Sequence, residues 1–199
     1  MGGIHGRTEA TGRGVQFGLR EFFRHPEDVQ RAGLEGGLDG KRIVVQGLGN
    51  VGYHAAKFLT EEDGVKVTAI IERDGASIND EGFDIEAVFQ HKCATGGVKG
   101  APGEQSFEGN GAVVLEKECD VLLPAAMEGQ ITRENAERIQ TNIIAEAANG
   151  PVTYQAEAIL IEKGVVIIPD VYLNAGGVTV SYFEWTQNLQ QFHWSEEKV

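Results

Sequence analysis

The chain has little cysteine, no long apolar run and no excess of basic residues. Its 199 residues include two cysteines, Cys93 and Cys119, which are not in C-x-x-C spacing. This argues against a disulfide framework and for a reducing compartment, in which both thiols would be buried as small apolar groups. No apolar stretch is long enough to span a membrane, and the N-terminus lacks a signal-peptide pattern, so a cytoplasmic location is expected.

Acidic residues outnumber basic ones, and the formal net charge is −13. Such a charge repels the phosphates of nucleic acids and anionic lipids, so neither is expected as a partner. Hydrophobic residues make up 41% and charged residues 24% of the chain. These fractions are ordinary for a soluble globular protein, and the length suits one domain, or one plus a fragment, with a sizeable core.

The most informative segment is the turn G-L-G-N-V-G at residues 47–52. A β-branched run, residues 43–45, precedes it. Apolar residues at helical spacing follow it: Val51, Ala55, Phe58 and Leu59. Strand, turn and helix are the context in which G-x-G-x-x-G indicates a dinucleotide site. In this motif Gly47 makes the tight turn, Gly49 admits the diphosphate, and Gly52 allows close packing of helix and strand. The N–H groups at the helix start would face the phosphate charge.

Glu72 ends the next predicted strand, residues 65–71. An acidic residue about 20 positions beyond the turn is expected to bind the adenosine ribose hydroxyls. A carboxylate there favours NAD over NADP, because it would repel the 2′-phosphate. Arg73 leaves NADP open, since a guanidinium can bind that phosphate. The alternative for Glu72 is a solvated loop acid.

Apolar runs alternate with helical patterns along the whole chain. This predicts an α/β fold, namely a Rossmann-type doubly wound, mostly parallel sheet with helices on both faces. The predicted strands are residues 43–45, 65–71, 119–123, 142–145 and 165–168. The predicted helices are residues 15–23, 51–59, 85–89, 132–139, 151–161 and a long helix from about 177, whereas 94–111 are interpreted as a long surface loop.

The four polar or glycine-rich segments that follow predicted strands are expected to meet in one cleft. They are residues 47–52, 124–128, 146–151 and 169–181. Ligands of doubly wound sheets bind beyond the carboxyl ends of the strands, so this cleft is the predicted site.

Five segments together resemble the C-terminal cofactor-binding domain of hexameric glutamate dehydrogenases, in the Glu/Leu/Phe/Val dehydrogenase family. They are G-R-T-E-A-T-G-R-G-V (6–15), residues 47–52, P-A-A-M-E (124–128), A-E-A-A-N-G-P (145–151) and N-A-G-G-V-T-V-S-Y-F-E-W (174–185). The resemblance implies oxidative deamination of L-glutamate to 2-oxoglutarate and ammonia, with NAD as cofactor and NADP less favoured. It also implies a homo-hexamer for the intact enzyme.

The resemblance further implies a role for each matching residue. Thr11, Asn149 and Asn174 would contact the nicotinamide side of the cofactor. Asn50 and Val51 would contact its phosphates, and Ala125 and Ala126 belong to a matching cofactor segment. Val178 would line the substrate pocket, and Ser181 would bind the side-chain carboxylate of the substrate. Ordinary structural roles are the alternative: Asn149 and Asn174 as turn residues, Ser181 as a helix-face hydroxyl and Thr11 as an N-cap.

No catalytic residue is predicted in this chain, because the family takes its catalytic lysines and aspartate from an N-terminal substrate domain. Residues 1–199 are therefore expected to form a single dinucleotide-binding domain, with 1–35 as a helical lead-in and 174–199 as a truncated C-terminal helix. Such a fragment, or half of a split enzyme, would bind cofactor without turnover. Apolar surface should be exposed at both ends.

Two further features are interpreted as structural. Lys99 in G-G-V-K-G looks like the substrate lysine motif of the family but lies in an unrelated loop. His91 and Cys93 have no second ligand pair nearby, so no metal site is predicted. The rival functions are a non-catalytic NAD-binding module and a branched or aromatic amino-acid dehydrogenase of the same family.

Overall fold

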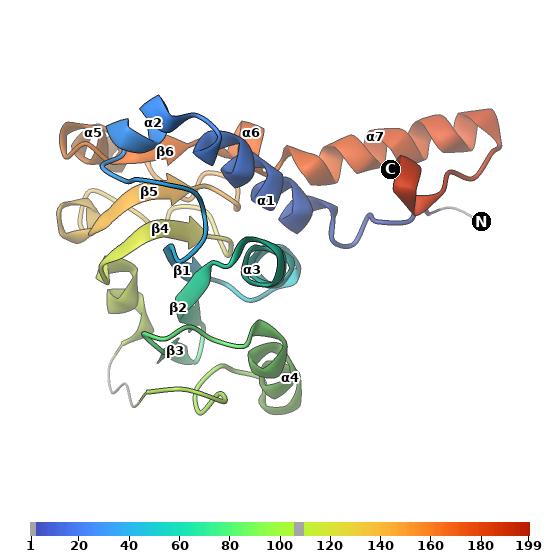
Figure 1. Cartoon of the computed structure of the whole chain (residues 1–199). Helices are drawn as coiled ribbons and strands as arrows, with labels where there is room; N and C mark the ends of the chain where they lie inside the picture. The colour runs from blue at the N-terminus through green and yellow to red at the C-terminus, as the bar shows by residue number, and fades with distance from the viewer. Residues whose placement is uncertain (1–2, 106–109) are drawn as a thin grey trace.

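The short β-branched runs of the sequence form a central sheet (Figure 1). The computed structural model describes residues 3–105 and 110–199. Its six strands lie in the order β3-β2-β1-β4-β5-β6, and every neighbouring pair is parallel except β2 and β3. The strands are β1 (Arg42–Gln46), β2 (Lys66–Glu72), β3 (Gly75–Ile78), β4 (Cys119–Pro124), β5 (Thr141–Ala145) and β6 (Val166–Ile168). The predicted Rossmann-type, mostly parallel sheet is confirmed.

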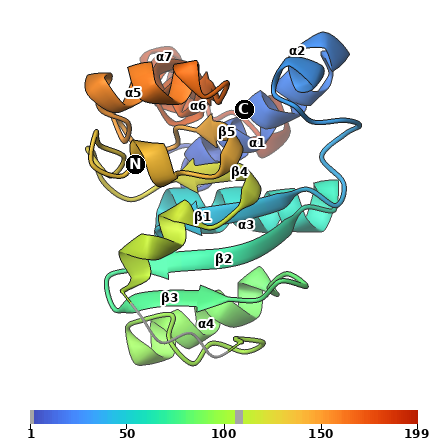
Figure 2. The ribbon, with the colours of Figure 1, turned by 90° about the vertical axis from the view of Figure 1, so that its left-hand side faces the viewer.

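Helices cover both faces of this sheet, and Figure 2 shows the strands side by side from β3 at the bottom upward. The α-helices are α1 (Ala10–Phe23), α2 (Pro26–Arg31), α3 (Asn50–Asp63), α4 (Ile85–Thr95), α5 (Tyr154–Glu162), α6 (Asp170–Leu173) and α7 (Ala175–Gln190). The 3₁₀ turns are η1 (Gly111–Glu116), η2 (Ala136–Arg138) and η3 (Glu196–Lys198). Within the described ranges, no helix has the length and apolar character needed to cross a bilayer.

The core is divided into two apolar clusters by the alternation of side chains along each strand. In β4, Val121 and Leu123 join the cluster that packs against α1, α3 and α4. Leu122 points to the other face and joins the cluster that includes η1 and α5. This period of two follows from the pleat of an extended chain. Both faces are thus buried, as parallel sheets require.

The strand order reverses between β1 and β4, and this reversal positions the site. From β1 the chain passes through α3 to β2 on one side, whereas β4 pairs with β1 on the other side. The loops that follow β1 and β4 therefore diverge and leave a crevice at the carboxyl ends of the strands. Doubly wound sheets bind ligands at such a switch point.

Glycines bring α1 close to two other helices. A Cβ atom at Gly12 would lie 2.6 Å from His54 Cβ and 2.7 Å from the Ala55 nitrogen on α3. At Gly14 it would lie 3.0 Å from the Gly176 Cα on α7. Gly12 and Gly14 thus allow α1 to pack closely against α3 and α7.

Several predicted elements differ from the observed ones. Residues 132–139 form only the short turn η2, because the Asn135 carboxamide oxygen accepts a hydrogen bond from the Thr132 N–H (2.8 Å) and competes with helix formation. The α5 helix begins at Tyr154 instead of Pro151, since Val152 pairs with Ile131 and Thr153 caps the helix. The β3 strand and α2 were not predicted. Part of the predicted loop, residues 106–109, lies outside the described residues.

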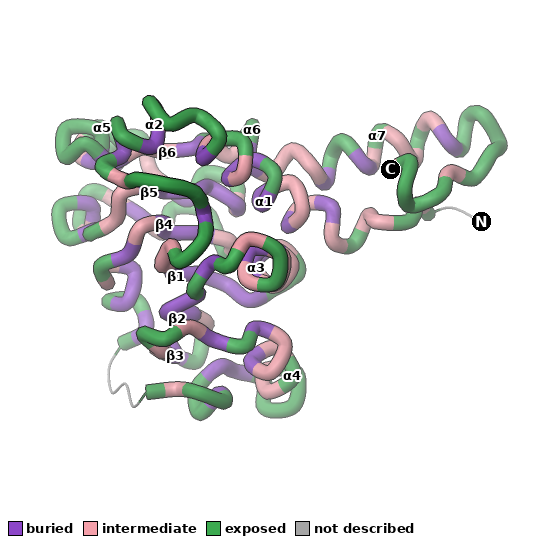
Figure 3. Tube along the Cα trace, viewed as in Figure 1, coloured by how far each residue is buried: buried purple, intermediate pink, exposed green. Residues whose placement is uncertain are grey.

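The C-terminal part of the chain also departs from the expected helix. The α7 helix extends away from the sheet (Figure 1) and ends at Gln190, where Gln191 has φ +54°. Residues 191–199 turn back, and the Gln187 oxygen accepts a hydrogen bond from the Trp194 N–H (2.8 Å). Exposed and intermediate segments dominate this helix in Figure 3. Apolar side chains are exposed along it, as predicted for this end: Val178, Tyr182, Trp185 and Leu189.

Candidate functional site

A first cavity of about 810 Å³ lies at the carboxyl ends of β1, β2 and β4. Its lining combines the glycine turn, the end of β2 and the segment after β4. The lining residues are Gln46, Gly47, Gly49, Ile71, Glu72, Arg73, Asp74, Gly75, Lys92, Gly96, Lys99, Asn110, Gly111, Ala112, Ala125, Ala126, Met127 and Gln130. Five predicted cofactor residues are among them, namely Gly47, Gly49, Glu72, Ala125 and Ala126. Its volume lies within the range of about 300–1,000 Å³ typical of small-molecule sites.

The three motif glycines have distinct steric surroundings. Gly47 has φ +89°, a conformation that other residues rarely adopt. A Cβ atom at Gly52 would collide with the Gly47 carbonyl oxygen, so Gly52 allows the helix to pack on the turn. At Gly49, by contrast, a Cβ atom would have no described heavy atom within 4 Å. Gly49 is also the N-cap of α3 and has no side chain to satisfy the first N–H groups. An open approach and available N–H donors suit a diphosphate.

Glu72 is fixed beside the turn. Its Oε1 accepts a hydrogen bond from the Leu48 N–H (2.7 Å) and from Lys92 Nζ (2.6 Å). Lys92 Nζ also donates to the Leu48 carbonyl oxygen (2.8 Å). The Glu72 side chain is only 15% exposed, so the interpretation as a solvated loop acid is wrong. Sequence reasoning missed Lys92, which belongs to α4; its only signal was a place in the polar end of that helix.

The other lining residues of the first cavity suit a ligand that carries negative charge and hydrogen-bonding groups. Three cationic residues line it, Arg73, Lys92 and Lys99, although the chain as a whole carries −13. Gln46 is 7% exposed, and its amide donates to Gln130 Oε1 (2.7 Å). The Gln46 Oε1 atom is buried and has no hydrogen-bond partner among the described residues. A buried acceptor on a cavity wall is a place for a ligand donor.

A second cavity of about 700 Å³ shares Ala125, Ala126 and Met127 with the first. Its other lining residues come from the N-terminal part of the chain, the start of α3, the segment after β4, the turn after β5, and α7 with the residue before it. They are Arg7, Thr11, Val51, Glu128, Ala147, Ala148, Asn149, Asn174, Gly177, Val178 and Ser181. All four segments that were expected to meet at the strand ends therefore contribute to these adjoining cavities.

The amide side chains of the second cavity are held in place. Asn174 Nδ2 donates to Asn149 Oδ1 (2.7 Å). The turn that carries Asn149 is fixed by Asp170, whose carboxylate accepts a hydrogen bond from the Gly150 N–H (2.8 Å). Glu146 accepts hydrogen bonds from the Asp170 and Val152 N–H groups, and burial raises the pKa of its carboxyl group. The two carboxamides thus present fixed donors and acceptors, which suits another carboxamide.

Arg7 and Ser181 both line the second cavity and are hydrogen-bonded to each other. Arg7 Nε donates to Ser181 Oγ (2.8 Å), although the two residues are 174 positions apart in the sequence. The Ser181 hydroxyl in turn donates to the Gly177 carbonyl oxygen (3.0 Å). A guanidinium beside a hydroxyl is suited to a carboxylate. Sequence reasoning did not single out Arg7.

Some predicted residues lie elsewhere or act differently. Asn50 and Gly52 line neither cavity, and Asn50 Nδ2 donates to the Thr8 carbonyl oxygen (2.6 Å). At Gly176 a Cβ atom would meet the Ala10 carbonyl oxygen, so this glycine allows the close approach of α1. Cys119 is buried as expected, whereas Cys93 is exposed.

Comparison with known proteins agrees with this arrangement. A family model described as Glutamate/Leucine/Phenylalanine/Valine dehydrogenase matches residues 2–199. The chain is 54% identical over 190 residues to the "Probable glutamate dehydrogenase" of Sinorhizobium fredii, which covers 94% of this chain and 42% of the relative. It is 52% identical over 188 residues to the mitochondrial glutamate dehydrogenase of Dictyostelium discoideum, again 94% of this chain and 37% of the relative.

Solved structures give the same result. The hetero-hexameric glutamate dehydrogenase of Thermus thermophilus matches with a TM-score of 0.85 and 34% identity, over 99% of this chain and 44% of that one. Glutamate dehydrogenase from Peptoniphilus asaccharolyticus matches with a TM-score of 0.75 and 34% identity, over 100% of this chain and 43% of that one. The chain spans about two fifths of the length of the curated relatives it matches. It belongs to the glutamate/leucine/phenylalanine/valine dehydrogenase family.

Proposed function

We propose that this chain is the cofactor-binding domain of an NAD-preferring glutamate dehydrogenase. The observation that supports this most is that two cavities share one wall at the switch point of the sheet. The first offers a glycine turn, free helix N–H groups and a fixed carboxylate. The second offers two carboxamides and a guanidinium–hydroxyl pair. These are the groups that a dinucleotide and a dicarboxylic substrate need.

The residues of the first cavity would hold the adenosine diphosphate part of the cofactor. Gly47, Gly49 and the first N–H groups of α3 would bind the diphosphate, and Glu72 would accept the ribose hydroxyls. The carboxylate supports NAD as the preferred cofactor. Thr11, Asn149 and Asn174 would orient the nicotinamide end. When bound, the cofactor accepts a hydride from the substrate.

The residues at the far end of the second cavity would hold the substrate. Ser181 Oγ and the Arg7 guanidinium would bind the side-chain carboxylate of glutamate, and Val178 would line the pocket. This pair supports glutamate over a branched or aromatic amino acid, because an apolar side chain would leave a guanidinium unpaired. The neighbouring carboxamides would then set the orientation of the cofactor against the substrate.

We propose that the chain by itself binds cofactor without turnover. Among the described residues, the second cavity has two ionisable lining side chains, Arg7 and Glu128, and no lysine. Deamination needs a base and a cation to polarise the carbonyl or imine. The whole protein would supply these from the part of its length that this chain does not match, and it would assemble as a homo-hexamer. The hetero-hexamer of Thermus thermophilus supports the hexameric assembly.

Substitution of Gly49 by alanine tests the cofactor site. The added Cβ atom would meet no described atom within 4 Å, so the fold tolerates it, but it would occupy the approach of the diphosphate. Gly37→Ala is the matched control, since it also adds a Cβ atom in open space and lies outside both cavities. We expect calorimetric titration with NAD to give a Kd at least about tenfold weaker for Gly49→Ala and unchanged for Gly37→Ala. Absence of NAD binding to the wild-type chain, or equal binding by both variants, would refute the proposal.

A further inference from the structure

The Lys92 ammonium group joins three separate elements at the adenosine end of the first cavity. It comes from α4 and contacts both the end of β2, through Glu72 Oε1 (2.6 Å), and the glycine turn, through the Leu48 carbonyl oxygen (2.8 Å). The Leu48 N–H donates to the same Glu72 oxygen (2.7 Å), which closes a ring of three contacts. The side chain of Lys92 is 22% exposed and that of Glu72 is 15% exposed, so water screens this pair only in part.

This ring leaves one carboxylate oxygen for a ligand. Glu72 Oε1 already accepts two hydrogen bonds, from Leu48 and Lys92. Within residues 3–105 and 110–199, no donor to Glu72 Oε2 is found. The carboxylate is therefore held in one orientation, with its second oxygen available to accept a hydroxyl hydrogen bond in the cavity.

The same contact changes the charge that a ligand would meet. A carboxylate alone would repel a 2′-phosphate of about −2, but the Lys92 ammonium compensates the Glu72 charge. Arg73 and Lys99 also line this cavity. The Asp74 carboxylate, the other acid there, accepts hydrogen bonds from the Val98 and Lys99 N–H groups (2.9 and 3.1 Å). The lining of the first cavity therefore has three cationic side chains against two acidic ones, so its charge is net positive.

We propose that Lys92 is a positioning residue that sets the discrimination between NAD and NADP. It orients Glu72 to bind the ribose of NAD, and by compensating the Glu72 charge it lets the site also accept NADP with a modest penalty. This inference depends on the proposed dinucleotide site and adds to it a residue and a dual cofactor range.

Charge substitutions on the 199-residue chain test the proposal through the ratio of the Kd for NADP to the Kd for NAD. Lys92→Met leaves the Glu72 charge uncompensated, so the ratio should rise about tenfold. Glu72→Gln leaves the Lys92 charge uncompensated, so the ratio should fall about tenfold. The double variant removes both charges and should return the ratio to within about threefold of the wild-type value. Lys92→Arg keeps the charge and should also stay within about threefold.

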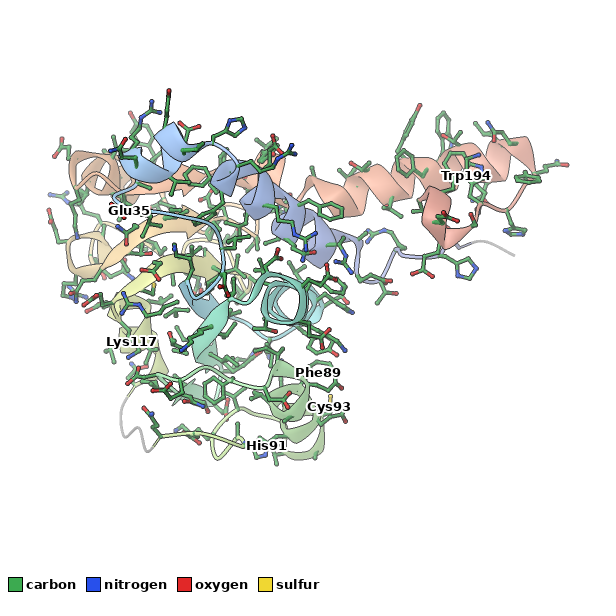
Figure 4. All side chains as sticks on the ribbon, viewed as in Figure 1. Glu35, Phe89, His91, Cys93, Lys117 and Trp194 are labelled. Carbon is green, nitrogen blue, oxygen red and sulfur yellow. The ribbon has the colours of Figure 1, made fainter. Side chains whose placement is uncertain are left out.

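Lys117→Met is the matched control, because it removes one positive charge from a lysine that is also paired with a carboxylate, Asp80 (2.9 Å). Lys117 lines neither cavity, and Figure 4 shows it well apart from α4, on which Phe89, His91 and Cys93 are labelled. We expect its ratio to be unchanged.

Opposite shifts in the two single variants and recovery in the double variant would support the proposal, since a purely structural role of Lys92 would not be restored by a second substitution. If the wild-type chain binds NAD but the ratio does not move in Lys92→Met, this inference is refuted and the proposed function stands. If the wild-type chain binds neither cofactor, both are refuted.

Discussion

Replacement of Gly12 by alanine tests whether the close contact between α1 and α3 depends on the lack of a side chain at this position. The α1 helix carries Thr11, which lines the second cavity, whereas α3 begins at the glycine turn, which lines the first. The two helices touch at Gly12, where an added Cβ atom would lie 2.6 Å from His54 Cβ and 2.7 Å from the Ala55 nitrogen. Ordinary contact begins at 3.4 Å, so α1 would have to move by roughly 0.8 Å.

The magnitude follows from two opposing terms. Alanine in a helix interior is favoured over glycine by about 1 kcal/mol, which is an upper bound for Gly12 in the first turn of α1. Overpacking against a wall that includes backbone, which cannot rotate away, costs about 3 kcal/mol. The net loss in the free energy of unfolding is therefore about 2 kcal/mol, or about 6 °C in Tm for a chain of this size.

Gly18→Ala on the same helix is the control. Its gain in helix propensity is at least as large, but its Cβ atom would meet the end of a side chain, Leu173 Cδ1, at 2.6 Å. That atom can rotate, so we expect a change in Tm of about 2 °C or less. Urea titration and thermal melts of both variants measure the difference. Equal shifts in Tm would refute the argument that contact with the α3 backbone is what Gly12 provides.

Two further predictions concern ionisable groups. Hydrogen bonds from Tyr53, Gln90 and Lys57 lower the pKa of the Glu86 carboxyl to about 2 from its ordinary 4.5. Because the pKa is lowered on folding, the stability that this group contributes is present above pH 4.5 and lost as the pH falls towards about 2. The Tm difference between the wild type and Glu86→Gln should therefore be constant near neutral pH and become smaller as the pH falls below 4.5. A difference that is unchanged at about pH 3 would contradict this. For the thiols, burial raises the pKa of Cys119 to about 11, whereas Cys93 is exposed. A thiol reagent at about pH 8 should label Cys93 alone in the folded chain and both cysteines in denaturant, and rapid labelling of both without denaturant would exclude the buried environment of Cys119.

Features with a local cause could be predicted from the sequence. The glycine turn needs a positive φ at Gly47 and close packing at Gly52, and both are observed. Asp84 is the N-cap of α4, a position that Asp favours, and its Oδ1 accepts a hydrogen bond from the Ala87 N–H (3.0 Å). Short apolar and β-branched runs predicted five of the strands. In each case the information lies within a few consecutive residues.

Features that depend on partners distant in the sequence were missed. The β3 strand has only four residues and exists because it pairs with β2, so its own residues carry little signal. The turn at 136–138 is short because Lys163 Nζ donates to the carbonyl oxygens of Ala136, Glu137 and Ile139, from more than 20 positions away. Propensity predicts a helix there, but this contact and the Asn135 side chain favour a turn.

The sequence by itself determined the doubly wound sheet, the glycine turn and the acidic residue that follows it, because these depend on residue types at fixed short spacings. The tertiary structure alone decided that Lys92 fixes Glu72 and that Arg7 reaches Ser181. Their polar atoms meet only after α4 has packed against α3 and α1 has packed against α7. The sequence sets the chemical type of each side chain. Tertiary packing determines which charged groups and hydrogen-bond donors from distant segments lie next to it.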